Sequence, residues 1–142
     1  MKIIAHNLNG GVVITYITDN LSIKEYCYKF LNNDQNYVEL SNSNFLDIYF
    51  KDAWELKNNI LSVNIDKAKK IHLEYFRKAR TPILAALDIE FMRAVESGDT
   101  ALQSEIAGKK QALRDVTSID LPDTLEGIKA TWPDILGQSP FS

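Results

Sequence analysis

The sequence predicts an α+β fold: a small N-terminal antiparallel sheet with one helix, then a long antiparallel helical hairpin and a short C-terminal helix. Short β-branched runs separated by glycine and asparagine fill the first part of the chain, as expected of strands and turns. From residue 66 the apolar residues recur at helical spacing, and a second helical pattern follows Gly98. We therefore expect an α+β lobe over residues 1–65, and over residues 66–142 the hairpin, a short third helix and a tail.

The composition of the 142 residues is that of an ordinary globular protein, with 45% apolar and 25% charged residues. Lysine and arginine number 16 against 19 aspartates and glutamates, so the net charge of −3 gives no general attraction to nucleic acid or to a membrane. The longest apolar run covers residues 83–87, far short of the roughly 18 residues that cross a bilayer. With no signal-peptide pattern and a single cysteine, we expect a soluble protein of a reducing compartment with no membrane partner.

A β-hairpin is predicted at the N-terminus. Apolar residues 3–5 precede a turn, and the β-branched run of residues 12–18 follows it. Gly10 and Gly11 can supply the positive φ angles of a tight turn. No lysine or serine follows at the spacing of a phosphate-binding loop, so we interpret the two glycines as a turn.

The first predicted helix begins at a capping box formed by Ser22 and Glu25. Its apolar stripe has the spacing of one helix face and consists of Ile23, Tyr26, Cys27, Phe30 and Leu31. Because Cys27 lies on this stripe and no nearby feature would lower its pKa, we interpret it as a buried structural thiol. A nucleophilic role for Cys27 in a small enzyme is a separate hypothesis.

Residues 34–64 are ambiguous, with alternating runs at 37–40 and 60–65 that indicate two further strands. An aromatic cluster between these runs contains Phe45, Tyr49, Phe50 and Trp54. Such a cluster can form a ligand box, but it more often belongs to the core of a small sheet, which is the interpretation we prefer.

The long helix is predicted from an N-cap at Asp66 to about residue 97. Pro82 should kink it or split it, with Thr81 as a new N-cap. Residues 83–95 are apolar on several sides, so this half should pack against more than one neighbour.

Gly98 suits the end of that helix, and Asp99 or Thr100 suits the start of the next. The second helix carries a near-heptad apolar seam of Leu102, Ile106, Leu113 and Val116. So short a connection requires the two helices to be antiparallel. A short helix should follow from about residue 124 and end before Pro133.

The sequence contains no local metal or catalytic pattern. His6 and His72 belong to different elements, neither has a second ligand at helical spacing, and no Cys-x-x-Cys is present. We expect surface histidines and no catalytic, cofactor or metal site.

The clearest local signal is the basic segment of residues 66–80, which contains six cations and only two acidic residues, Asp66 and Glu74. The cations are Lys67, Lys69, Lys70, Arg77, Lys78 and Arg80. This segment can track phosphates, form a solvated face with internal ion pairs, or contact a protein. The partner-binding candidates are Arg77, Arg80, Tyr75 and Phe76, because two arginines three residues apart can grip carboxylates and aromatic residues are common at interfaces.

Short motifs run along most of the chain, most densely between residues 50 and 133. They are Asn9-Gly10-Gly11-Val12, Phe50-Lys51-Asp52-Ala53-Trp54, Asp66-Lys67-Ala68-Lys69, Arg77, Arg80, Leu84, Leu87-Asp88, Arg93-Ala94-Val95-Glu96-Ser97-Gly98-Asp99, Lys110-Gln111-Ala112-Leu113-Arg114-Asp115 and Trp132-Pro133. Together they resemble a loose family of small tailed-bacteriophage proteins, found among tail and virion genes and often described as tail-assembly or virion-associated.

The resemblance implies a non-enzymatic structural or assembly protein of the virion or tail. It implies partners among other phage virion or tail proteins, several copies or a homo-oligomer, and a location in the virion or in the host cytoplasm during assembly. The alternative is a small nucleic-acid-binding module that uses the basic helix over residues 67–80.

Overall fold

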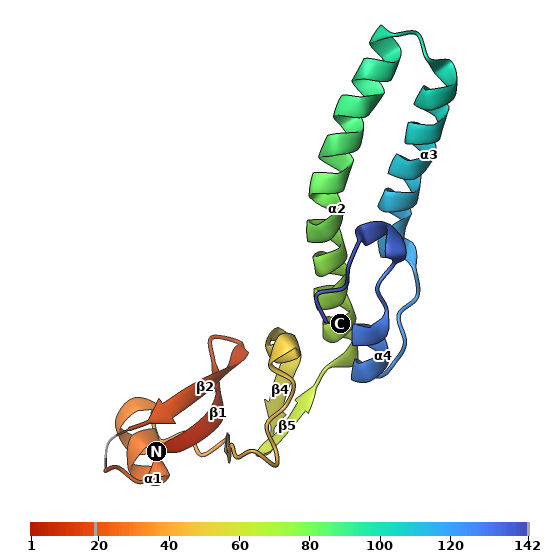
Figure 1. Cartoon of the computed structure of the whole chain (residues 1–142). Coiled ribbons are helices and arrows are strands. Elements are labelled where there is room, and N and C mark those ends of the chain that lie inside the picture. The colour runs from red at the N-terminus through yellow and green to blue at the C-terminus, as the bar shows by residue number, and fades with distance from the viewer. Residues whose placement is uncertain (19, 142) are drawn as a thin grey trace. The chain divides into compact units, whose positions relative to one another are not determined.

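The computed structural model describes residues 1–18 and 20–141 and confirms the predicted α+β class (Figure 1). The chain divides into two compact units, residues 1–68 and residues 69–142. This division lies close to the predicted boundary at residue 65.

The first unit is built on a three-stranded antiparallel sheet. Strand β1 (Lys2–Leu8) lies in the middle, between β2 (Gly11–Ile17) and β3 (Tyr37–Glu39). The β1–β2 turn is Asn9-Gly10, with φ angles of 52° and 81°, and not Gly10-Gly11 as predicted. The reason is that Gly11 already pairs with Leu8 in the ladder, which leaves the preceding two residues to make the turn.

Helix α1 (Ile23–Phe30) confirms the predicted capping box. The backbone N–H of Ser22 donates to the Glu25 carboxylate over 2.7 Å, and the N–H of Glu25 donates to the Ser22 hydroxyl over 3.2 Å. The predicted apolar stripe is only partly buried. Cys27 is fully buried, whereas Phe30 is 62% exposed and packs its ring on Tyr26 at the surface.

The 3₁₀ helix η1 (Ile48–Ala53) leads into a second hairpin of β4 (Trp54–Lys57) and β5 (Ile60–Val63). Its turn also has two residues with positive φ, Asn58 and Asn59. The side-chain amide of Asn59 donates to the carbonyls of Gln35 and Tyr37, which fixes this turn beside β3.

Apolar side chains from both hairpins form the core of the first unit. Its buried members are Ala5, Val12, Leu40, Trp54 and Leu56. Phe50 is fully buried as well, so the core interpretation of the aromatic cluster holds for Phe50 and Trp54. Phe45 is 40% exposed and touches Trp54 edge-on.

Helix α2 (Ile65–Glu96) is continuous over 32 residues. Asn64, and not Asp66, caps its start, since the Asn64 side-chain oxygen accepts from the N–H of Lys67 over 3.0 Å. Pro82 does not split the helix, and the Thr81 hydroxyl donates to the Arg77 carbonyl within it. One missing backbone hydrogen bond on an exposed face is a local cost that a long, packed helix can bear.

Helix α3 (Thr100–Asp115) runs antiparallel beside α2 (Figure 1). Gly98 ends α2 with a φ of +69°, and the Asp99 carboxylate caps α3 by accepting from the N–H of Leu102. The predicted hairpin and its turn are therefore present. Cross-links between the helices include an ion pair of 2.5 Å between Lys110 and Asp88.

After α3 come η2 (Val116–Ser118), α4 (Leu125–Ala130) and η3 (Asp134–Leu136). The fully or almost fully buried side chains of the second unit are His72, Phe76, Ala94, Ile106, Leu113 and Ile128. Over the described residues, no helix combines the length and apolarity needed to cross a bilayer.

Replacing Leu113 with alanine should lower the free energy of unfolding by about 2–5 kcal/mol, because the side chain is fully buried and leaves a cavity. Leu102→Ala on the same helix is the control, since Leu102 is 39% exposed and should cost clearly less. Chemical denaturation measures both. Equal losses at the two positions would contradict this core.

Candidate protein-interaction surface

Phe76, one of the four predicted partner-binding residues, is fully buried and is not available to a partner. Its ring lies 4.9 Å from the His72 ring and 5.3 Å from the Trp132 ring, measured between centroids. Phe76 is therefore a core residue that joins α2 to the C-terminal segment.

Arg80 is used by the fold and does not form the predicted carboxylate grip with Arg77. Its guanidinium donates to the backbone carbonyls of Arg114 over 3.0 Å and Leu113 over 3.3 Å, at the end of α3. These carbonyls lack partners within the helix and carry the negative end of its dipole, so a cation stabilises them. Arg77 pairs instead with Glu74, one turn back on α2.

Most of the other cations in the basic segment also have a partner within the chain. Lys67 lies 3.3 Å from a carboxylate oxygen of Glu55, and Lys69 lies 2.5 Å from one of Asp123. Lys70 and Lys78 form no ion pair among the described residues, and Lys78 lies over the Tyr75 ring. Most of the positive charge of the basic segment is thus neutralised within the chain, as in the solvated-face interpretation with internal ion pairs.

Tyr75 is the predicted candidate that remains partly open, with 38% of its surface exposed. Its ring faces Phe141 from the C-terminal tail at a centroid distance of 6.3 Å. Tyr75 therefore lies at the edge of the aromatic cluster that includes Phe76 and Trp132.

His72 is fully buried in this cluster, contrary to the prediction of surface histidines. Its Nε2 lies 2.7 Å from the Thr131 carbonyl oxygen, and since a carbonyl only accepts, Nε2 is the donor. Burial lowers the pKa of His72, and the hydrogen bond to Thr131 opposes this in part. A signal was present in the sequence, because His72 lies midway between Ala68 and Phe76 at four-residue spacing.

His6 and Cys27 are buried in the first unit. His6 Nε2 lies 2.8 Å from the Thr15 hydroxyl. Burial raises the pKa of the Cys27 thiol, which disfavours the thiolate that a nucleophile requires. Among the described residues, no group of three or more histidine, cysteine or acidic side chains is placed to hold a metal ion.

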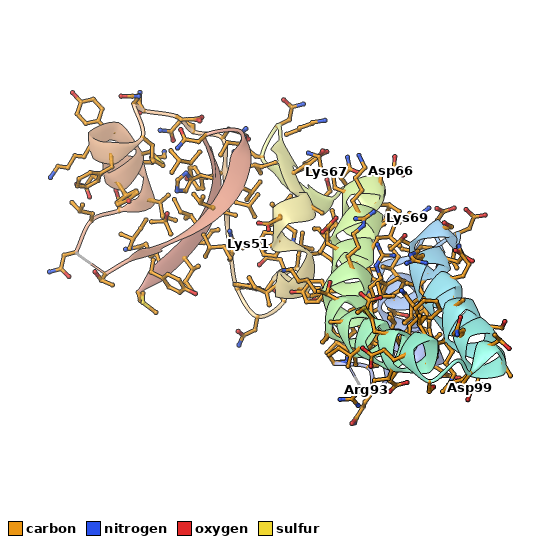
Figure 2. The ribbon with its side chains drawn as sticks, turned by 90° about the horizontal axis from the view of Figure 1, so that it is seen from above. Lys51, Asp66, Lys67, Lys69, Arg93 and Asp99 are labelled. Carbon is orange, nitrogen blue, oxygen red and sulfur yellow. The ribbon has the colours of Figure 1, made fainter. Side chains whose placement is uncertain are left out.

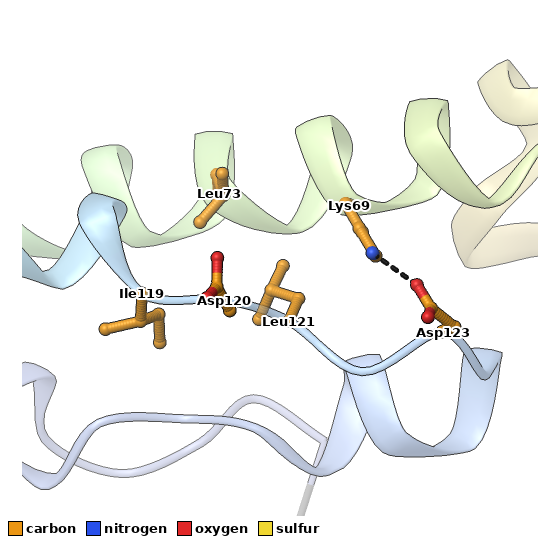
Figure 3. A pocket seen from close by; sticks show the side chains of 6 residues that line it. All are labelled: Lys69, Leu73, Ile119, Asp120, Leu121 and Asp123. Carbon is orange, nitrogen blue, oxygen red and sulfur yellow. Dashed lines mark hydrogen bonds and ion pairs between the residues drawn. The ribbon is translucent and has the colours of Figure 1, made fainter.

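A shallow hollow of about 360 Å³ lies between the start of α2 and the segment that follows η2 (Figure 3). Lys69 and Leu73 point toward it from α2, and Asp120 and Asp123 come from the opposite side. The ion pair of Lys69 and Asp123 spans it, so its charges mainly attach this segment to the helix.

The side of α2 turned away from α3 carries apolar side chains that nothing in the described chain covers. Ile89 is 56% exposed and Met92 is 63% exposed. Ile89 comes two residues after Leu87, so it lies about 200° around the helix from that inward-facing position. Arg93 and Glu96 border these residues in the last turns of α2, close to the connection at Asp99 (Figure 2).

We call this side of α2 the outer face and define it by six exposed residues. They are Lys78, Pro82, Ala85, Ile89, Met92 and Glu96. The sequence predicts that residues 83–95 pack against more than one neighbour, whereas in the structure α3 covers one side of them and Ile89 and Met92 stay exposed, so the second neighbour remains a prediction. The outer face is the candidate interaction surface of the molecule.

Comparisons with known proteins identify no relative. No protein-family model matches the chain, and neither a curated protein nor a solved structure is significantly similar to it.

Acidification should destabilise the second unit through His72. The folded-state pKa lies below the ordinary value of about 6.5, so the unfolded chain takes up a proton that the folded chain does not bind. The free energy of unfolding should therefore fall as the pH drops from about 7 through 6.5 and below. His72→Gln, measured by denaturation at each pH, should flatten this dependence, and an unchanged slope would exclude His72 as its origin.

Arg80→Met should lower stability by about 1.5–3 kcal/mol, because it removes charge-assisted hydrogen bonds to the end of α3 and keeps the aliphatic stem. The matched control is Arg77→Met, which removes only an exposed ion pair worth about 0–1 kcal/mol. Thermal and chemical unfolding of both variants measures the difference. A larger loss for Arg77→Met would show that the two roles are assigned the wrong way round.

Proposed function

We propose that this protein is a non-enzymatic structural or assembly component of a tailed bacteriophage, acting through contacts with other virion or tail proteins. The phage setting rests on the sequence resemblance, and the observation that supports action through protein contacts is the exposed outer face of α2, with Ile89 and Met92 more than half accessible. Folding of the hairpin does not require apolar side chains there, since α3 lies on the opposite side. An exposed apolar helix face bordered by charged residues is typical of a surface that another protein covers.

The state of the candidate nucleophile supports a non-enzymatic role. Cys27 is fully buried and its pKa is raised, which is the reverse of what nucleophilic catalysis needs. His72 is also buried; it donates to the Thr131 carbonyl within an aromatic cluster and thereby joins α2 to the segment that follows α4.

The proposal includes assembly in several copies, or a homo-oligomer, located in the virion or in the host cytoplasm while particles assemble. A hairpin that presents one apolar helix face is suited to this, because each copy offers the same surface to its neighbours.

Nucleic-acid binding through residues 67–80 is less well supported. Four of the six cations in that segment are held by Glu55, Asp123, Glu74 or the end of α3. Phosphate contacts would have to come mainly from Lys70 and Lys78. A steep fall of DNA affinity with salt concentration would favour this alternative.

The double variant Ile89→Lys with Met92→Lys should keep its fold, because both side chains are exposed and lysine is a good helix former. Its amount in purified phage particles, measured by quantitative mass spectrometry, should fall at least about tenfold if the outer face makes the assembly contact. The control is Ile60→Lys in the first unit, where the isoleucine is 68% exposed. Normal incorporation of the double variant would contradict the proposal.

A further inference from the structure

The six residues of the outer face have a symmetric order along α2. Their spacings alternate between four and three residues, which is the pattern of the core positions of a coiled coil. Counted from Leu87, they lie at nine, five and two residues before it and at two, five and nine residues after it. The pattern therefore reads the same in both directions from the level of Leu87.

The chemistry of the six residues is complementary under this reversal. The two ends are Lys78 and Glu96, which carry opposite charges. Between them, Pro82 corresponds to Met92 and Ala85 corresponds to Ile89. Each apolar pair joins a smaller and a larger side chain, which is how facing layers of a helix pair interdigitate.

We propose that a second copy of this chain covers the outer face, with the two α2 helices packed antiparallel about a two-fold axis at the level of Leu87. This inference rests on the proposed function, which makes the outer face an interaction surface. In this arrangement Lys78 of each copy meets Glu96 of the other, and Ile89 of each copy packs against Ala85 of the other. The contact is isologous, so it closes as a dimer.

The charges fix the direction of the two helices. A parallel pair would place Lys78 against Lys78 at one end and Glu96 against Glu96 at the other, and both contacts repel. An antiparallel pair turns both ends into attractions. Lys78 and Glu96 are exposed and neither forms an ion pair among the described residues; Lys78 lies over the Tyr75 ring, so pairing with Glu96 of the other copy replaces or adds to that contact.

The flanking residues nearest the two-fold axis are compatible with close packing. On one flank, Ala86 lies near the two-fold axis and meets its own equivalent, so the helices can approach each other. On the other flank, the two Asp88 side chains come near the axis. Each Asp88 is already paired with Lys110 of its own chain at 2.5 Å, so the two aspartates and two lysines that meet there carry no net charge.

Charge reversal tests the arrangement, with sedimentation velocity over micromolar to submillimolar protein as the readout. Lys78→Glu alone and Glu96→Lys alone should each weaken dimerisation at least about tenfold, because both ends then carry like charges. The double reversal, with both substitutions in one chain, should restore it. An equimolar mixture of the two single variants should form heterodimers, since each end then joins a glutamate to a lysine.

Glu90→Lys is the matched control, because it makes the same charge change on the same helix but off the outer face. It should leave dimerisation unchanged, and the circular dichroism and thermal midpoint of every variant should stay close to those of the parent. A chain that is monomeric over the whole concentration range overturns the self-pairing. A double reversal that fails to restore the dimer overturns the antiparallel register.

The two proposals can fail separately. If the chain is monomeric but Ile89→Lys with Met92→Lys is still lost from particles, a different protein covers the outer face and the proposed function stands. If the dimer forms as described but particle incorporation does not depend on Ile89 and Met92, the self-pairing stands and the proposed role in assembly is wrong.

Discussion

The stability of the second unit depends on burial of the apolar side chains along helix α2. A single helix of 32 residues has little stability of its own in water, and its apolar side chains must be buried by other parts of the chain. Two segments share this task on α2. The C-terminal segment covers the beginning through the aromatic cluster of His72, Phe76 and Trp132, and α3 covers the rest.

Arg80 lies where the covering of α2 changes from one segment to the other. Its bonds to the carbonyls of Leu113 and Arg114 attach the end of α3 to α2 at the point where the chain leaves the helix toward η2. The ion pair of Lys69 with Asp123 attaches the segment between η2 and α4 to helix α2. Lys69 and Arg80, two of the six cations in the first half of α2, therefore hold the returning chain in place.

The covering is one-sided. Cross-links such as Lys110 to Asp88 and Gln103 to the Ala94 carbonyl lie on the side of α2 that faces α3. On the opposite side of α2, Ile89 and Met92 stay exposed, and Lys78 and Glu96 lie at the two ends of the outer face. The proposed assembly role requires a surface of this kind, and the symmetry of the outer face about Leu87 supports the proposal that a second copy covers it.

Much of the architecture was determined by local sequence. The Ser22–Glu25 capping box, the ending of α2 at Gly98 and the start of α3 after Asp99 need only near neighbours along the chain, so their residues alone predict them. The α+β class follows from hydrophobic periodicity in the same way. Of the two outcomes predicted for Pro82, a kink or a split, the split does not occur, because one missing hydrogen bond on an exposed face does not interrupt the helix. Local pattern was wrong at Asp66, where Asn64 caps the helix instead.

Only the tertiary structure decided which side chains are available to a partner. Arg77 and Arg80 look equivalent in sequence, yet one is paired on the surface and the other is bound to the end of a helix 33 residues away. Phe76 and His72 are buried because the tail, some 60 residues further along the chain, folds back onto them. Such contacts depend on the return path of the chain, which periodicity does not encode. The sequence therefore indicated that the second half of α2 is apolar on several sides, but only the placement of α3 showed which side remains open.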